Sequence, residues 1–84
     1  MTNKIHDLKI LPRYFDLVKR GIKNFEVRKN DRDFEVGDML ELLEWDDKEH
    51  KYTGRNERRK IIYILNDIDY CKEGYVILGL DIWD

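Results

Sequence analysis

Residues 12–28 read PRYFDLVKRGIKNFEVR, and within this stretch the spacing of the apolar residues changes from helical to alternating. Pro12 suits the first turn of a helix, where its missing N–H has no partner to lose. Four apolar residues then recur at helical spacing: Tyr14, Phe15, Leu17 and Val18. Basic residues 19–20 fall in the last turn, where cations suit the helix dipole, and Gly21 can end the helix in a left-handed conformation. The stretch predicts a short helix over residues 12–20.

The residues after Gly21 alternate between apolar and polar, which is the period of a β-strand. Phe25 and Val27 point to one side, and the polar residues of the segment point to the other: Asn24, Glu26 and Arg28. We therefore expect residues 23–28 to form a strand with one apolar and one polar face.

Four further segments have the composition of strands and are separated by turns rich in Gly, Asn and Asp. They are Ile5–Leu11, Met39–Trp45, Lys60–Leu65 and Tyr75–Trp83. The polar stretch over residues 46–57, DDKEHKYTGRNE, is interpreted as a mobile hairpin loop. Five short strands and one helix predict an α+β domain, built as a small β-barrel with the helix at one opening.

The bulk composition limits the class of protein. A chain of 84 residues makes one domain, here residues 1–84, and 42% hydrophobic residues are enough for a core. A single cysteine, Cys71, cannot close an intramolecular disulfide, which favours a reducing, cytoplasmic compartment. The N-terminal residues resemble no signal peptide, and no apolar run approaches the roughly 20 residues that a membrane span needs, so we expect no membrane partner.

The net charge of −2 hides an uneven distribution along the chain. Residues 1–32 carry +5 and residues 50–64 carry +4, whereas residues 33–49 carry −7 and residues 65–84 carry −4. Two basic blocks in a near-neutral protein can form one positive face if the fold brings them together. The sequence alone leaves that question open.

Four residues after the predicted helix follow the pattern G-x-K-x-x-E-x-R: Gly21, Lys23, Glu26 and Arg28. This spacing, directly after a short helix, resembles the signature of the ASCH family, named for homology to the activating signal cointegrator. The flanking sequence is also similar, and the chain looks most like a small ASCH-like family of bacteria and their phages that is described only as a domain of unknown function. The resemblance implies a PUA-like β-barrel, an RNA-binding role, and a cleft near the motif between barrel and helix.

One branch of the ASCH family comprises amidohydrolases that deacetylate acetylated cytidine with a lysine, a threonine and a glutamate. Lys23 matches the lysine of that branch, but Glu26 stands where the branch has its threonine nucleophile. In this alternative, Lys23 is the base and Glu26 is the acid/base of a small hydrolase. The departure at Glu26 argues against it.

The chemistry of the motif residues supports a binding site without the resemblance. A lysine and an arginine around one carboxylate hold it ionised, and they keep spare donors for a phosphate or a base edge. Glu26 then orients the two cations or accepts from a base amino group, and Gly21 lets a ligand approach the backbone. The alternative is a salt-bridge cluster that ties the helix to the barrel.

A second candidate contact is the basic run that contains Arg58 and Arg59, beside Tyr52. Basic residues with an aromatic ring can contact phosphates and stack on a base, although a solvated hairpin loop is the slightly favoured interpretation. Tyr75 and Trp83 are interpreted as core rather than as a stacking surface. The soft metal ligands of the chain are His6, His50 and Cys71. No two of them have the spacing of a metal site, so we expect no metal. We also expect no cofactor.

These observations favour a module that binds RNA or a nucleotide at the Gly21–Arg28 segment, with Arg58 and Arg59 as additional contacts. The small hydrolase is one alternative, and a protein-interaction adaptor that uses the acidic hairpin is another. RNA or nucleotide binding needs a continuous basic face, the hydrolase needs an enclosed pocket, and the adaptor needs an exposed apolar patch.

Overall fold

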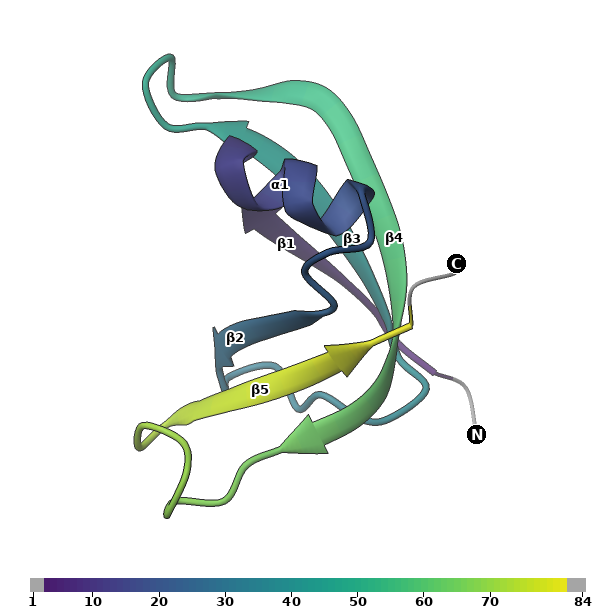
Figure 1. Ribbon diagram of the computed structural model, residues 1–84, viewed down its shortest axis with the longest axis vertical. Coiled ribbons are helices and arrows are strands. Elements are labelled where there is room, and N and C mark those ends of the chain that lie inside the picture. The colour runs from purple at the N-terminus through teal and green to yellow at the C-terminus, as the bar shows by residue number, and fades with distance from the viewer. Residues whose placement is uncertain (1–2, 82–84) are drawn as a thin grey trace.

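The computed structural model describes residues 3–81, which contain five strands and one helix (Figure 1). In chain order these are β1 (Ile5–Ile10), α1 (Pro12–Lys19), β2 (Phe25–Lys29), β3 (Met39–Asp46), β4 (Lys51–Leu65) and β5 (Tyr75–Leu80). The predicted helix and the predicted strand after Gly21 are both confirmed to within one or two residues at their ends.

Helix α1 begins and ends as its sequence predicts. Pro12 occupies its first turn, and Phe15 and Val18 form its buried side. Gly21 has a φ of +74° and donates its N–H to Val18 O, while the N–H of Ile22 bonds Leu17 O. These two hydrogen bonds form a Schellman motif, in which a residue with positive φ closes the last turn.

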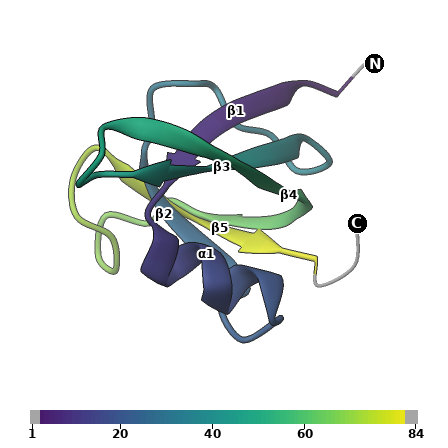
Figure 2. The ribbon, with the colours of Figure 1, turned by 90° about the horizontal axis from the view of Figure 1, so that it is seen from above.

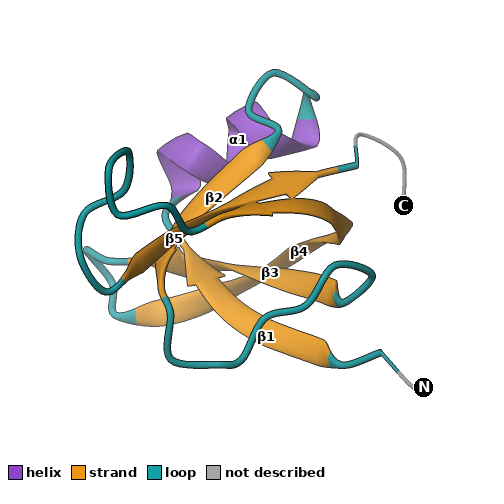
Figure 3. Cartoon of the chain, turned by 90° about the horizontal axis from the view of Figure 1, so that it is seen from below, coloured by secondary structure: helices purple, strands orange, loops and turns teal. Residues whose placement is uncertain are grey.

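The strands form one five-stranded sheet in the order β1-β3-β4-β5-β2. β1 runs parallel to β3, and the other neighbours are antiparallel. β4 belongs to both halves of the sheet, because its residues 51–60 pair with β3 and its residues 61–65 pair with β5. The strand curves between the two halves, so that β2 and β5 lie over β1 and β3 (Figures 1 and 3).

The predicted barrel is not confirmed, because no backbone ladder among residues 3–81 joins the end strands β1 and β2. Side chains from β2 and from the segment after it reach β1 instead. Arg28 Nη2 donates to Lys9 O and Arg32 Nη1 donates to Asp7 O, each at 2.7 Å. The α+β class is confirmed, and residues 3–81 contain a single helix as predicted; the sheet is open along one side.

The core lies between the two halves of the sheet, and α1 packs against β3 and β4 from one side of the strands (Figure 2). Its buried apolar residues are Leu8, Ile10, Phe15, Val18, Phe34, Leu40, Leu42, Ile61, Val76, Leu78 and Leu80. The predicted last strand is confirmed as far as Leu80, with Val76, Leu78 and Leu80 buried. Residues 82 and 83, the end of the predicted strand, lie outside the described residues.

The prediction of a loop over residues 46–57 is wrong for most of its length. β4 already begins at Lys51 and pairs with β3, leaving residues 47–50 as the turn. Charge pairing across the two strands takes the place of apolar alternation: Arg58 lies opposite Glu41, with Nε 2.7 Å from Oε2. The pairing of β3 with β4 shifts in register between Leu43 and Trp45. Within residues 3–81, no helix is long and apolar enough to cross a membrane.

Candidate functional site

Strand β2 has the predicted alternation, but its polar face is the one that points inward. Glu26 is only 4% exposed, whereas Phe25 and Val27 are 45% and 52% exposed. A buried carboxylate is costly unless it is paired and hydrogen-bonded, so its neighbours decide whether this arrangement is stable.

The carboxylate of Glu26 lies between two cations from its own motif. Lys23 Nζ donates to Oε1, and Arg28 approaches Oε2 with Nε at 3.0 Å and Nη2 at 2.8 Å. Lys23 also donates to Phe25 O at 2.7 Å, and Arg28 Nη2 also donates to Lys9 O. Three residues of the motif therefore converge as predicted, and they tie β2 to the end of β1.

A groove of about 480 Å³ runs beside this cluster, between the end of β1, the start of α1 and β2. It is lined by Lys9, Ile10, Leu11, Tyr14, Lys23, Phe25, Glu26, Val27 and Arg28. The Lys23 ammonium lies 4.9 Å from the ring centre of Phe25 and 5.6 Å from that of Tyr14. The groove thus combines apolar walls, two half-exposed aromatic rings and cationic donors around a buried carboxylate.

Gly21 is not among the residues that line the groove. A Cβ atom there would meet no atom within 4 Å, so the preference for glycine at this position comes from its φ of +74°. By ending α1 in a left-handed turn, Gly21 lets the chain reverse and bring Lys23 back to Glu26. Direct approach of a ligand to its backbone stays a prediction.

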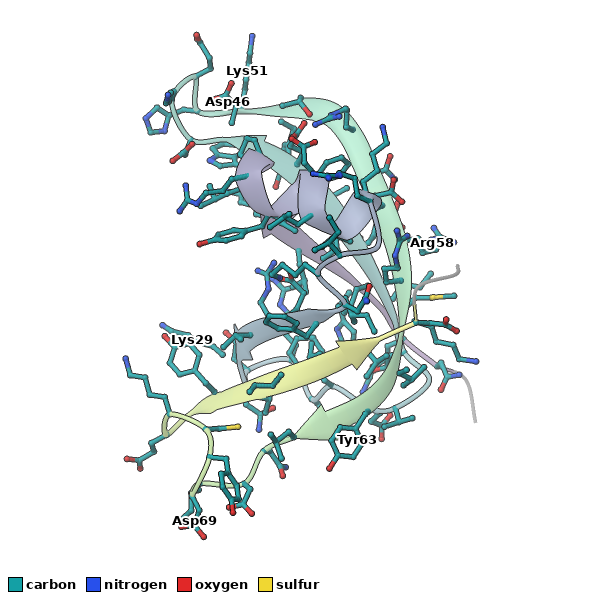
Figure 4. All side chains as sticks on the ribbon, in the orientation of Figure 1. Lys29, Asp46, Lys51, Arg58, Tyr63 and Asp69 are labelled. Carbon is teal, nitrogen blue, oxygen red and sulfur yellow. The ribbon has the colours of Figure 1, made fainter. Side chains whose placement is uncertain are left out.

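The two arginines predicted as additional contacts point to opposite sides of β4. Arg59 is 6% exposed, and it donates to Val18 O at 3.2 Å and to Glu57 Oε2 at 3.0 Å. Arg58 lies on the outer side of the strand (Figure 4) and bonds Glu41. Neither lines the groove. Their binding role stays untested, but the structure does not bring them to the motif.

The second basic block is matched by the acidic block beside it. Arg55 bridges Glu44 at 2.8 Å and Asp16 of α1 at 3.1 Å, and its guanidinium lies over the ring of Phe15. Hydrogen bonds from Arg55 hold the pKa of Glu44 below its ordinary value, although burial of the carboxyl acts in the opposite direction. These arginines join α1, β3 and β4 rather than extending the positive surface of the groove.

Four residues of the groove lie outside the Gly21–Arg28 segment and were not predicted from the sequence, and neither was one buried pair. Lys9 and Tyr14 line the groove, and only the fold brings them to the motif. His6 is buried and its Nε2 lies 2.8 Å from Asp38 Oδ2, which also accepts the N–H of Glu35. The pair holds the segment before β3 against β1. The described part of the chain has no group of three side chains placed to hold a metal ion.

Comparison with known proteins places the chain among relatives that share nearly its whole length. Residues 5–80 match the family described as "Domain of unknown function (DUF3850)". The chain is also 42% identical over 78 residues to the "Uncharacterized 12.9 kDa protein in GpA 3'region" of Escherichia phage P2, a match that covers 93% of this chain and 69% of the phage protein. The match includes α1, β2 and every residue of the groove, so the chain belongs to the DUF3850 family.

Proposed function

We propose that the groove binds a nucleotide unit of RNA. The observation that carries the proposal is the meeting of two cations, Lys23 and Arg28, with two half-exposed rings, Tyr14 and Phe25, in one groove. Proteins that bind single-stranded nucleic acid combine cationic contacts to the backbone with aromatic rings on which bases stack. The resemblance of the motif to the ASCH signature supports the same ligand class.

Arg28 is the residue best placed to contact phosphate. Its side chain is 23% exposed, and its orientation is fixed on two sides, by Glu26 and by Lys9 O. A guanidinium that is already held in place loses little freedom when it binds a phosphate. Because both oxygens of Glu26 accept from cations, its role in the proposal is to position Lys23 and Arg28.

Hydrolysis of a modified nucleoside is the less favoured function for this groove. It requires Glu26 to exchange a proton with substrate or water, whereas the residue is 4% exposed and its carboxylate is engaged by two cations. We expect at most weak deacetylation of acetylated cytidine. Robust turnover that is lost in Lys23→Ala would establish the hydrolase instead.

The binding proposal is tested with a labelled ten-nucleotide RNA of mixed sequence and the matched variants Arg28→Ala and Arg58→Ala. Both remove an arginine that bonds a glutamate, but only Arg28 lines the groove. We expect Arg28→Ala to weaken binding about tenfold, the effect of losing one charge-assisted contact, and Arg58→Ala to change it less than about twofold.

Salt dependence gives an independent measurement. Phosphate contacts release counterions, so wild-type binding should weaken with rising salt, and the slope should become shallower by about one in Arg28→Ala. Absence of RNA binding, or equal losses in the two variants, would show the motif to be a structural salt-bridge cluster.

A further inference from the structure

A second aromatic cluster lies at the end of the β3–β4 hairpin. The rings of Trp45 and Tyr52 meet edge to face, with centroids 4.9 Å apart. Tyr52 is 49% exposed. Asp46 and Lys51, labelled in Figure 4, mark the turn that follows, at the tip of the hairpin.

Lys9 connects this cluster to the groove. It lines the groove at the end of β1, and its backbone carbonyl accepts the hydrogen bond from Arg28. Its ammonium, however, lies 3.9 Å from the ring centre of Trp45 and 5.8 Å from that of Tyr52. The groove and the aromatic pair therefore lie on the two sides of a single residue.

We propose that Trp45 and Tyr52 form a second base-stacking subsite, so that the ligand is a single-stranded segment of at least two nucleotides that passes over Lys9. The inference rests on the proposed function of the groove and extends it from one nucleotide unit to a strand. A stacked base is recognised by its π-face, which all four bases share, so the subsite lengthens the ligand without selecting its sequence.

Lys9 occupies the face of Trp45 in the absence of a ligand. An exposed cation–π contact is weak, and the lysine side chain is long and flexible. A base can therefore take the place of the ammonium on the indole ring, and Lys9 then moves onto the phosphate that joins the two nucleotides. The same cation shields Trp45 in the free protein and binds the backbone of the strand in the complex.

The charges beyond Trp45 define where this path ends. Asp46 and Asp47 follow it directly, and Asp46 Oδ1 accepts the backbone N–H groups of Lys48 and Glu49. Lys48 and Lys51 lie near Asp46, but the two carboxylates come directly after Trp45 and repel a phosphate beside it. The subsite accordingly takes a terminal base, with its phosphate on the side of Lys9.

The test uses uridine monophosphate and uridine oligonucleotides of two, four and six units. The chain has two tryptophans, so a Trp83→Phe background leaves Trp45 as the only indole. We expect the monophosphate to bind without quenching Trp45 fluorescence. An oligonucleotide long enough to span Lys9 should bind about tenfold more tightly, the gain from one stacked base, and should quench it.

Tyr52→Leu and Tyr63→Leu form a matched pair, because both tyrosines lie on β4 with 49% and 62% exposure, and Tyr63 is in the other half of the sheet (Figure 4). Tyr52→Leu should remove most of the gain from chain length and leave monophosphate binding unchanged. Tyr63→Leu should alter neither. Melting temperatures establish that both variants are folded.

The outcomes separate the two proposals. Monophosphate binding that depends on Arg28, with no gain from chain length and no quenching of Trp45, overturns the second subsite and leaves the groove proposal intact. Loss of monophosphate binding in a folded Tyr52→Leu variant overturns it as well, since the two subsites would then not be separate. If no uridine probe binds and Arg28→Ala changes nothing, both proposals fail.

Discussion

Strands β2 and β4 each carry a glutamate and an arginine two residues apart, yet the fold uses the two pairs in opposite ways. In β2, the side chain of Glu26 is 5% exposed and that of Arg28 is 23% exposed. In β4, Glu57 is 22% exposed and Arg59 is 8% exposed. Both pairs have an arginine nitrogen 3.0 Å from the carboxylate. The local pattern is the same, and the burial is reversed.

The position of each strand in the sheet explains the reversal. β4 is internal, and α1 covers the side on which Arg59 lies, so the guanidinium finds a carbonyl at the end of the helix, Val18 O. β2 is an end strand beside an open groove. The arginine there can bond its glutamate and still reach a ligand. An E-x-R pattern in a strand is therefore buried scaffold or open to a groove according to what covers it.

Removing Arg59 should have the largest effect on stability. Arg59→Ala takes away the donors to Val18 O and Glu57 and leaves a gap under α1. We expect a loss of about 3 kcal/mol in the free energy of unfolding, measured by urea denaturation. Arg28→Ala should lose about 1 kcal/mol. Equal losses would mean that the two pairs do not differ in role.

For the glutamates we expect the opposite order, with a larger loss of stability in β2 than in β4. Glu26→Ala leaves Lys23 and Arg28 beside each other without their shared carboxylate, and we expect a loss of about 2 kcal/mol. Glu57→Ala removes a more exposed partner and should cost less than about 1 kcal/mol. RNA binding should weaken in Glu26→Ala only, because the cations of the groove lose their positions. Unchanged binding would remove Glu26 from the proposed site.

The ladder of β3 and β4 should respond to acid through Glu44. Its pKa is lowered in the folded protein, so its stabilising effect is present above the unfolded pKa of about 4.3 and is lost as pH falls through the folded pKa. Glu44→Gln should make stability less dependent on pH below this value. Thermal unfolding between pH 3 and pH 6 measures the difference, which we expect to be smaller than the loss in Arg59→Ala. Parallel pH profiles of the wild type and Glu44→Gln would contradict this expectation.

The smallest effect is expected for Arg28→Lys. Lysine keeps the charge but cannot bond Glu26 and Lys9 O with the same fixed geometry. We expect a stability change within about 0.5 kcal/mol and RNA binding about two- to threefold weaker. Calorimetry and RNA titration on the same preparation give both values. Binding as weak as in Arg28→Ala would mean that the guanidinium geometry, rather than its charge, accounts for the contact.

Local signals predicted the segments that depend on local interactions. The helix over Pro12–Lys19 and its end at Gly21 follow from residues within one turn of each other. The contacts of Lys23 and Arg28 with Glu26 span three residues or fewer, so the convergence of these side chains could also be predicted from the sequence. The N-terminal part of β4 could not be predicted in this way. Residues 51–57 have no apolar alternation, and their partners in β3 are up to 15 residues away.

The sequence by itself determined the helix, the alternation of β2 and the polar cluster of the motif, because each rests on neighbours along the chain. The tertiary structure decided which face of β2 is covered, where the sheet stays open and which cations remain at a groove. These features depend on the order of strands and on the distant residues that meet there. Lys9 and Arg28 are 19 residues apart and become neighbours only when the two ends of the curved sheet approach each other. Charge along a chain locates candidates for a site, and the partners that folding supplies determine which of them stay available to a ligand.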